Sequence, residues 1–307
     1  MQNVTSLMHV LCCPKTKKAL ELHDGYLKSQ NGNYPIVNNI PLFETQEIDT
    51  NAQIQQQHYT KVADAYARNL QYPHTKAYMS YLDDVFREMV LTEPLGLVAE
   101  LCCGTGETFK ILPEIQNGVG IDIAPTMLSK AIQGTNNKNI IFLQANALKL
   151  PFVDESFDTV SMLGGIHHIP DRNALFKEVA RILKPGGRFI FREPLNDFWL
   201  WRALRFLIYK ASPFLDDKTE RPLKTIETIP LLQQCGLQKI SWQPAGFFGF
   251  CLFMNSDILI FNRVFQYIPC ISAFVKKVAL LDRVLLKFHL VRNAGLQIIG
   301  VFEKKAK

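Results

Sequence analysis

Between residues 93 and 194, short apolar runs alternate with stretches in which apolar residues recur at helical spacing. The apolar runs have the length and composition of buried strands, and they read LGLVAELC, NGVGIDI, NIIFLQA, FDTVSML and GRFIFRE. Helical patterns such as PTMLSKAIQG and RNALFKEVARILKPGG lie between them, and the KPGG that closes the second pattern stops a helix sharply. This alternation predicts an α/β fold in which helices cover both faces of a parallel sheet.

The chain before this region divides into two parts. Residues 1–46 contain short β-type runs separated by the turn signals DG, NG and NN, which predict a small β-rich unit. Residues 47–92 are polar with a helical period, and Tyr59 and Tyr66 fall on one face of the expected helix. We expect a helical lid there, in which the two tyrosines either close over a binding site or pack on the core.

The chain after Pro194 adds two inserts to the core. Residues 195–224 form an aromatic and basic insert that begins LNDFWLWRALRFLIYK. A helical pattern, TIETIPLLQQCGL, and a strand pattern, QKISWQPA, complete the segment 93–246. Residues 247–295 are a mainly helical apolar insert, and residues 296–307 supply a final strand, LQIIGVFEK.

Composition places the chain among ordinary globular proteins, with 307 residues, 48% of them apolar and 20% charged. No apolar run reaches the length of roughly 20 residues that a spanning helix needs. The N-terminus has no basic residue ahead of a short apolar stretch, which argues against a signal peptide. The seven cysteines include two adjacent pairs and no C-x-x-C, so we expect no disulfide framework and a cytoplasmic location.

The stretch VAELCCGTGETFK, residues 98–110, carries the first chemical signal, because a strand ends there in an acid and turns tightly into a helix. A dinucleotide site would need a small residue at position 109, where Phe109 stands. Pyrophosphate on the helix N-terminus would also be repelled by Glu107. Glu100 and Glu107 favour a ligand with positive charge and no phosphate, and S-adenosylmethionine matches that description.

Asp122 ends the next strand, about 20 residues downstream, in GVGIDIAPTML. A carboxylate at this place can accept both hydroxyl hydrogen bonds of a ribose. The alternative is that Asp122 caps the helix that follows it. We expect the ribose role, because strand, turn and spacing agree.

These segments, with LQANALKLPFVDESFDTVSM and HHIPDRNALFKEVARILKPGGRFIFREP, resemble successive motifs of the class I S-adenosylmethionine-dependent methyltransferases. Those related to the ubiquinone and menaquinone C-methyltransferases are the most similar, and the likeness covers about residues 93–194. The resemblance implies a Rossmann-like sheet of seven strands whose last strand is antiparallel. It also implies S-adenosylmethionine as the cofactor.

The resemblance assigns cofactor roles to positions that match the family motifs. Glu100, Gly104 and Gly106 would shape the methionine end of the site, and Leu163 and Gly164 would face the amino-acid end. Asp122 would hold the ribose, and the residues beside the adenine would be Ile123, Met127, Asn146 and Ala147.

Two positions depart from the family pattern. The family usually has glycine where Cys102 stands, so either the loop is displaced or the cofactor contacts the Cβ of Cys102. It usually has aspartate where Asn146 stands. Since an amide oxygen can still accept from the adenine amino group, we expect weaker binding rather than none.

Three residues after the fourth and fifth core strands are candidates for proton transfer. His167 and His168 follow FDTVSML, and Glu193 ends GRFIFRE. A histidine that titrates near neutrality is suited to removing a proton from a hydroxyl or an activated carbon. The alternative is that one histidine only bonds backbone in the turn before Pro170.

Residues 1–46 resemble the small zinc-ribbon-like domain of methyltransferase activator subunits. A metal-binding copy would have Cys-Pro-x-Cys, whereas here Cys13-Pro14-Lys15 is followed by Thr16. We therefore expect no metal.

The apolar insert sits between the last two strands, where insertions in this fold commonly cover the substrate, so we expect a small hydrophobic or lipid-like acceptor and O- or C-methylation. Ribosomal RNA base methylation and a non-catalytic cofactor-binding protein are the alternatives.

One face of a predicted helix in this insert is apolar and consists of Phe274, Val278, Leu281, Leu285 and Phe288. Basic residues lie outside this face. Segments 195–210 and 274–291 either touch the inner face of an anionic membrane peripherally or pack on the core.

Overall fold

The computed structural model describes residues 4–30, 32–43, 68–211, 221–254 and 261–306, with side chains of 207–211 excepted. Residues 47–67 of the predicted lid, with Tyr59 and Tyr66, lie outside the described residues.

A seven-stranded sheet forms the centre of the molecule, in the order β10-β11-β9-β8-β5-β6-β7. Its strands are β5 (Leu97–Leu101), β6 (Asn117–Asp122), β7 (Ile140–Gln144), β8 (Phe157–Leu163), β9 (Leu183–Pro194), β10 (Leu237–Ala245) and β11 (Gln297–Lys304). Strands β5 to β9 are parallel, and β11 runs antiparallel to β9 and β10. This confirms the predicted α/β Rossmann-like sheet and its antiparallel last strand.

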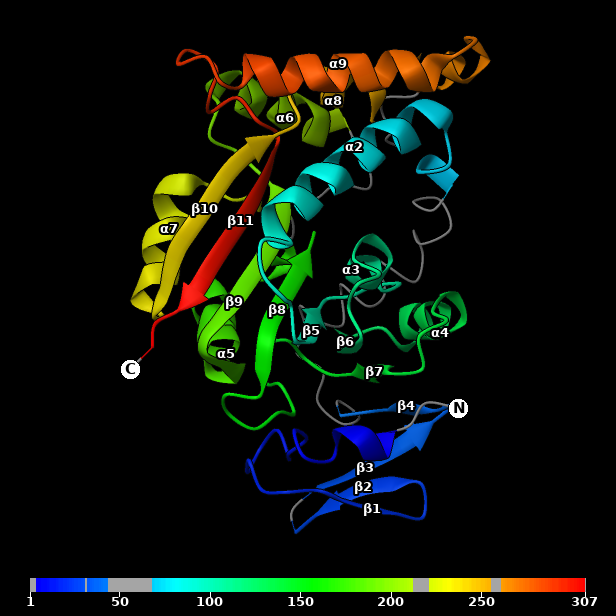
Figure 1. Ribbon diagram of the computed structural model, residues 1–307, viewed down its shortest axis with the longest axis vertical. Helices are drawn as coiled ribbons and strands as arrows, with labels where there is room; N and C mark the ends of the chain where they lie inside the picture. The colour runs from blue at the N-terminus through cyan, green and yellow to red at the C-terminus, as the bar shows by residue number, and fades with distance from the viewer. Residues whose placement is uncertain (1–3, 31, 44–67, 212–220, 255–260, 307) are drawn as a thin grey trace.

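Helices cover both faces of this sheet (Figure 1). One face packs against α5 (Arg172–Ile182) and α7 (Thr225–Gln234). The other packs against α2 (Pro73–Val90), α3 (Glu107–Ile111) and α4 (Pro125–Gly134). Alternate side chains of each strand serve the two cores: Ala99 joins the first and Val98 the second.

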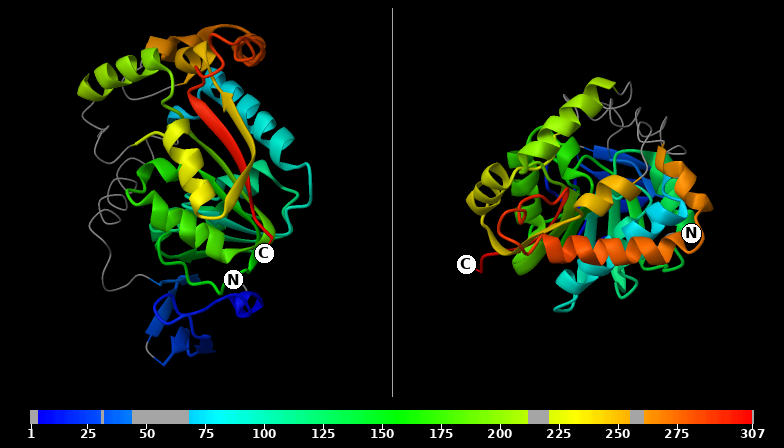
Figure 2. Two further views of the ribbon diagram at one scale, coloured as in Figure 1. Left: turned by 90° about the vertical axis from the view of Figure 1, so that its left-hand side faces the viewer. Right: turned by 90° about the horizontal axis from the view of Figure 1, so that it is seen from above.

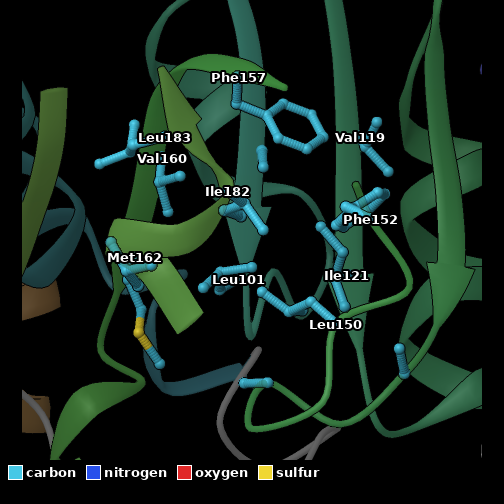
Figure 3. Close-up of a cluster of buried hydrophobic side chains, with 14 of the residues drawn as sticks. Leu101, Val119, Ile121, Leu150, Phe152, Phe157, Val160, Met162, Ile182 and Leu183 are labelled. Carbon is cyan, nitrogen blue, oxygen red and sulfur yellow. The ribbon is translucent and has the colours of Figure 1, made fainter. Parts of the chain in front are cut away.

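The N-terminal unit is an antiparallel sheet that belongs to the first core rather than to a core of its own. A short helix, η1 (Val4–Leu7), precedes its strands, which are β1 (Glu21–His23), β2 (Tyr26–Ser29), β3 (Gly32–Val37) and β4 (Ile40–Pro41). Leu11 bridges to Phe152, a member of the buried cluster in Figure 3. Leu42 bridges to Gln144 of β7, so the unit covers a strand that would otherwise be an exposed edge.

The cap is the name used here for residues 195–206, 246–254 and 261–295. It contains most of α6 (Trp199–Ala211), then α8 (Phe248–Phe253), η3 (Phe261–Tyr267) and α9 (Ile271–Leu285). It lies at the end of the molecule opposite the N-terminal unit (Figure 1).

The predicted apolar face of α9 adjoins the side of the helix that is fully buried. The helix buries Ile271, Val275, Ala279 and Asp282 against α2 and α8. Phe274, Leu281 and Phe288 of the predicted apolar face are more than half exposed. Val278 of the same face packs against the second core and Leu285 is half-buried, so this face is packed only in part.

Tyr78 of α2 holds the cap to the core through a buried polar contact. Its hydroxyl donates to Oδ2 of Asp282 at 2.5 Å, and both side chains are almost fully buried. The Asp282 carboxylate also accepts from the backbone N–H groups of Phe247 and Gly249. Burial, with the Asp282 charge, raises the pKa of Tyr78, so the phenol keeps the proton that it donates.

Candidate active site at the carboxyl edge of the sheet

The candidate residues gather where the parallel strands end. From β5 the chain builds β6 and β7 on one side and then β8 and β9 on the other, which makes the β5–β8 boundary a topological switch point. Ligands of open α/β sheets bind beyond the carboxyl ends of the strands at such a point. The strand-end residues there are Glu100, Cys102, Asp122, Asn146, Leu163, Gly164 and Glu193. His167 and His168 lie in η2 (Ile166–His168), directly after β8.

The glycine turn after β5 takes three left-handed residues within five positions. Their φ angles are 50° at Cys102, 53° at Gly104 and 81° at Gly106. Glycine adopts this conformation freely, whereas a residue with a Cβ loses about 1 kcal/mol. Cys102 thus keeps the backbone conformation that glycine favours at its position.

The Cys102 side chain is accommodated by a glycine on the next loop. A Cβ added to Gly165 would lie 2.8 Å from the Cβ of Cys102, so Gly165 provides the room. Burial, with the charges of Asp122, Glu193 and Glu100, raises the pKa of the Cys102 thiol. The thiol is therefore neutral and unsuited to act as a nucleophile.

Glu100 is fully buried at the end of β5 and ties the turn to α3. Its Oε1 accepts from the backbone N–H of Thr108 at 2.7 Å, and the Thr108 hydroxyl lies 2.9 Å from that of Ser161. Its Oε2 is buried without a hydrogen-bond partner. Burial raises the pKa of Glu100 to about 8, so a nearby cation would favour its ionised form.

Glu107 does not supply the free negative charge that the sequence predicted. It is half exposed and pairs with Lys110 at 2.9 Å, and it also accepts from the Thr105 hydroxyl. Although burial opposes the shift, the Thr105 hydrogen bond and the Lys110 charge lower the pKa of Glu107. Its charge is therefore offset locally, and the prediction that Glu107 attracts a cationic ligand is weakened.

Asp122 joins the two turns that face each other across β5 and β6. Its Oδ2 accepts from the backbone N–H of Gly104 at 2.8 Å, and its Oδ1 accepts from that of Ala124 at 2.9 Å. The N-cap of α4 is Ala124, so Asp122 braces the preceding turn and is not the cap. Burial raises the pKa of Asp122, and these backbone bonds oppose that rise. Each carboxylate oxygen has a further lone pair with which to accept.

The residues expected beside an adenine lie on the β6 and β7 side of this edge. Ile123 and Met127 are half-buried, and a Cβ on Gly104 would lie 3.6 Å from the Met127 methyl carbon. Ala147 is buried, whereas Asn146 is half-buried. The Asn146 Oδ1 already accepts from the backbone N–H of Leu148 at 2.9 Å, which leaves its amide N–H₂ and one lone pair for a ligand.

His167 and Glu193 form a bonded pair on the β8 and β9 side. Glu193 is fully buried, and its Oε1 accepts from the backbone N–H groups of Gly165 and Ile166 at 2.7 and 2.8 Å. Its Oε2 lies 2.7 Å from Nδ1 of His167. A carboxylate acceptor fixes the hydrogen on Nδ1 and leaves the lone pair on Nε2. The ring of His168 contacts that of His167 at 3.9 Å between centroids, with the two planes tilted by 40°.

Sequence reasoning missed Arg192 and Asp83, which support this loop from outside. The carbonyl oxygen of Arg192 accepts from the N–H of Gly164, and its guanidinium bonds Asp83 of α2 at 2.7 Å. Burial raises the pKa of Asp83, and the Arg192 charge opposes that rise. An arginine inside the apolar run FIFRE was the available signal, because a buried charge requires a partner.

The residues present suit an organic cation with hydroxyl groups. The unpartnered Oε2 of Glu100 lies in the same turn as the left-handed glycines, and Asp122 stands beside them with spare acceptor capacity. Among the described residues, no group of three His, Cys, Asp or Glu side chains is placed to hold a metal ion. Nor is any helix of the described ranges long and apolar enough to cross a bilayer.

Comparison with known proteins gives consistent matches. A family described as a methyltransferase domain matches residues 99–191. A demethylmenaquinone methyltransferase from Lactococcus lactis subsp. lactis is 40% identical over 136 residues, 41% of this chain and 54% of that protein, so the match spans about half its length. Another, from Bacillus licheniformis, is 33% identical over 177 residues, 50% of this chain and 76% of that protein.

The fold also matches solved structures. An S-adenosylmethionine-dependent methyltransferase from Thermotoga maritima superposes with a TM-score of 0.55 at 20% identity, covering 81% of this chain and 99% of that one. At this identity the likeness concerns the fold alone.

Proposed function

Because the chain belongs to the class I S-adenosylmethionine-dependent methyltransferases, we propose that it transfers the methyl group of this cofactor to a hydrophobic, quinone-like acceptor. The observation that carries the proposal is the pairing of His167 with the buried Glu193 beside the cofactor turn. The pair would supply a proton acceptor at the edge of the sheet to which the cap is attached.

S-adenosylmethionine supplies an electrophilic methyl group on a sulfonium. Glu100, Gly104 and Gly106 would hold its amino-acid end together with the loop at Leu163 and Gly164. Asp122 would accept from its ribose. Ile123 and Met127 would pack beside its adenine, with Asn146 and Ala147 at the adenine edge. Cys102 would contribute backbone and a neutral thiol to the same turn.

His167 would act as the general base. Its Nε2 would take the proton from an acceptor hydroxyl, which makes that oxygen, or the ring carbon conjugated with it, nucleophilic. His167 would hold this proton while the methyl group is transferred, and in carbon methylation the ring carbon would lose its own proton afterwards. Glu193 would hold the Nδ1 hydrogen and stabilise the imidazolium, and the tilted ring of His168 would pack against that of His167.

Three features support an oily acceptor. The curated relatives are named for demethylmenaquinone, a quinone with a lipid tail. Cap segments leave the sheet at the carboxyl ends of β9 and β10 and return at the start of β11, which is the edge that carries His167. The cap is rich in large apolar side chains, whereas an RNA acceptor would require a polar, basic groove.

The test is transfer of labelled methyl from S-adenosylmethionine to three acceptors: a demethylated naphthoquinol with a short isoprenoid chain, ribosomal RNA and a hydrophilic amine. We expect label in the quinol only. His167→Ala should abolish most of it, while the control His289→Ala, an exposed histidine of the cap, should not. Label in RNA alone would contradict the proposed acceptor, and no label with any acceptor would contradict the activity.

A further inference from the structure

Exposed apolar side chains of this protein are concentrated on the cap. Among the described residues, fifteen of the twenty large hydrophobic side chains that are exposed belong to it. They are Trp199, Leu200, Leu204, Phe206, Phe248, Phe261, Val264, Tyr267, Ile268, Phe274, Leu280, Leu281, Val284, Phe288 and Leu290. An apolar concentration of this size on one end of a globular protein marks a contact surface.

Helix α9 shows how this surface is built. Its buried positions, such as Val275 and Ala279, face α2 and α8, and Asp282 among them is fixed by Tyr78. At 100° per residue, Phe274, Leu281 and Val284 fall on a different arc of the helix, which is exposed. The cap is thus firmly attached on its inner side and apolar on its outer side.

The cap also carries an excess of positive charge, of which Arg283 is paired with Glu88 of α2. The described cap residues include eight basic residues and two acidic ones, Asp197 and Asp282. Both acids are engaged inside the protein, Asp282 by Tyr78 and Asp197 by the backbone N–H and hydroxyl of Thr225. On α9 the exposed Lys276 and Lys277, with Lys287 just beyond, adjoin the apolar arc.

The cap lies at the end of the molecule opposite the N-terminal unit, so that unit does not cover its outer side (Figure 1). Viewed from above, α6, α8 and α9 occupy the end of the molecule nearest the viewer (Figure 2). The same end carries the carboxyl edge of the sheet, because α6 follows β9, α8 follows β10 and α9 precedes β11.

We propose that the outer side of the cap docks on an anionic phospholipid bilayer, with its apolar side chains at the acyl boundary and its lysines against lipid phosphates. Helices with an apolar arc flanked by lysines bind such interfaces in this orientation. The purpose of this docking rests on the proposed function: it would bring an oily acceptor to the catalytic edge of the sheet. The docking itself requires neither acceptor nor cofactor.

Charge distinguishes an anionic bilayer from the other binding partners that the cap could have, a second copy of the chain and an RNA. A second copy docked through the same surface would bring two basic surfaces together, with no accessible acid among the described cap residues to compensate. An RNA would pair with the lysines and leave the aromatic and aliphatic side chains in contact with a highly charged backbone. Anionic lipid satisfies both the charge and the apolar area.

The test is flotation of the full chain, without acceptor or S-adenosylmethionine, on vesicles of phosphatidylcholine alone or with one third phosphatidylglycerol. We expect binding to the anionic vesicles only, weakening as salt rises. Reversing Lys276, Lys277 and Lys287 to Glu should lower partitioning on the order of a hundredfold, since each lysine near the surface contributes to it. Phe274→Ser with Leu281→Ser should lower it at least about tenfold.

Matched controls carry the same changes elsewhere on the surface. Lys15, Lys138 and Lys305 reversed to Glu, and Ile226→Ser with Ile240→Ser, should bind as the native chain does. Failure of the native chain to float at low salt would overturn the docking proposal, as would equal losses in controls and cap variants. Self-association abolished by the cap variants, without vesicle binding, would assign the surface to a second copy. Methyl transfer to a short-chain quinol is measured separately, so failure of docking leaves the proposed function standing.

Discussion

The core sheet and the cap arrange polar and apolar side chains in opposite ways. In the core, apolar side chains fill both faces of the sheet, and the buried acids Glu100 and Glu193 stand at its carboxyl edge, where the candidate chemistry is. In the cap, the buried network of Tyr78 and Asp282 faces inward, and large apolar side chains face outward. The core is organised for packing around a site, whereas the cap is organised for contact with something outside the protein.

The largest effect is expected from removing the inward-facing acid of the cap. Asp282→Ala leaves the Tyr78 hydroxyl and the N–H groups of Phe247 and Gly249 without their acceptor, which should lower the free energy of unfolding by about 4 kcal/mol. Hydrogen exchange should accelerate in α9 and remain slow in β5 and β6. The exposed Asp24→Ala provides the control, and equal urea midpoints for the two variants would contradict the role of this network.

A slightly smaller loss of unfolding free energy is expected from a substitution in the N-terminal unit, whose side chains belong to the core and do not touch the cap. Leu11 is buried against Phe152, so Leu11→Ala should cost about 3 kcal/mol and lower the unfolding midpoint of the whole sheet. The exposed Leu22→Ala should change little. If Leu11→Ala accelerated hydrogen exchange only within residues 4–43, the unit would have a core of its own, contrary to the contacts described above.

Glu100 should make the stability of the core depend on pH. Its pKa is about 8 in the folded chain against an ordinary 4.5, so between these values the folded state keeps a proton that the unfolded state has lost. Stability from this group is present at low pH and is lost as pH rises toward 8. Relative to Glu100→Gln, the native chain should lose about 2 kcal/mol between pH 6 and pH 8. Parallel urea midpoints for the two proteins across this range would contradict the buried, protonated state.

The outer side of the cap should tolerate change with a small effect. Phe274→Ser with Leu281→Ser should lower the free energy of unfolding by about 1 kcal/mol, because both side chains are about half exposed and only the Phe274 ring packs edge-on against the buried Phe253. Val275→Ala on the buried side of the same helix should cost about 2 kcal/mol. Thermal midpoints would decide the matter, and a large loss for the serine variant would mean that the outer side packs on the protein.

Local patterns predicted most of the core. The run FDTVSML coincides with β8, and PTMLSKAIQG coincides with α4, because strand and helix periods are written in neighbouring residues. Parallel strand ends meet at one edge, so placing His167 and Glu193 near each other was also within reach. The hydrogen bond between His167 and Glu193 could not be predicted, since it depends on the loop at Gly164 and Gly165 that turns backbone N–H groups toward Glu193.

Features set by the assembled structure escaped prediction, and one local partner was overlooked. Which arc of α9 packs is decided by its contacts with α2 and α8, so the sequence of the helix alone left the role of its apolar face open. Glu107 was assigned a free charge although Lys110, three residues on, was available as a partner. The pKa of Glu100 depends on complete burial, which only the assembled core provides.

The central claim is that His167 acts as the general base, and the variant His167→Ala tests it most directly. Its affinity for S-adenosylmethionine and its rate of methyl transfer to the quinol are measured on the same preparation. General-base catalysis contributes about a hundredfold or more, so the rate should fall by at least about tenfold. The calorimetric dissociation constant should stay within about twofold, because the cofactor turn lies on β5 and β6. An unchanged rate in His167→Ala would contradict the account, as would a loss of cofactor affinity that explains the whole loss of rate.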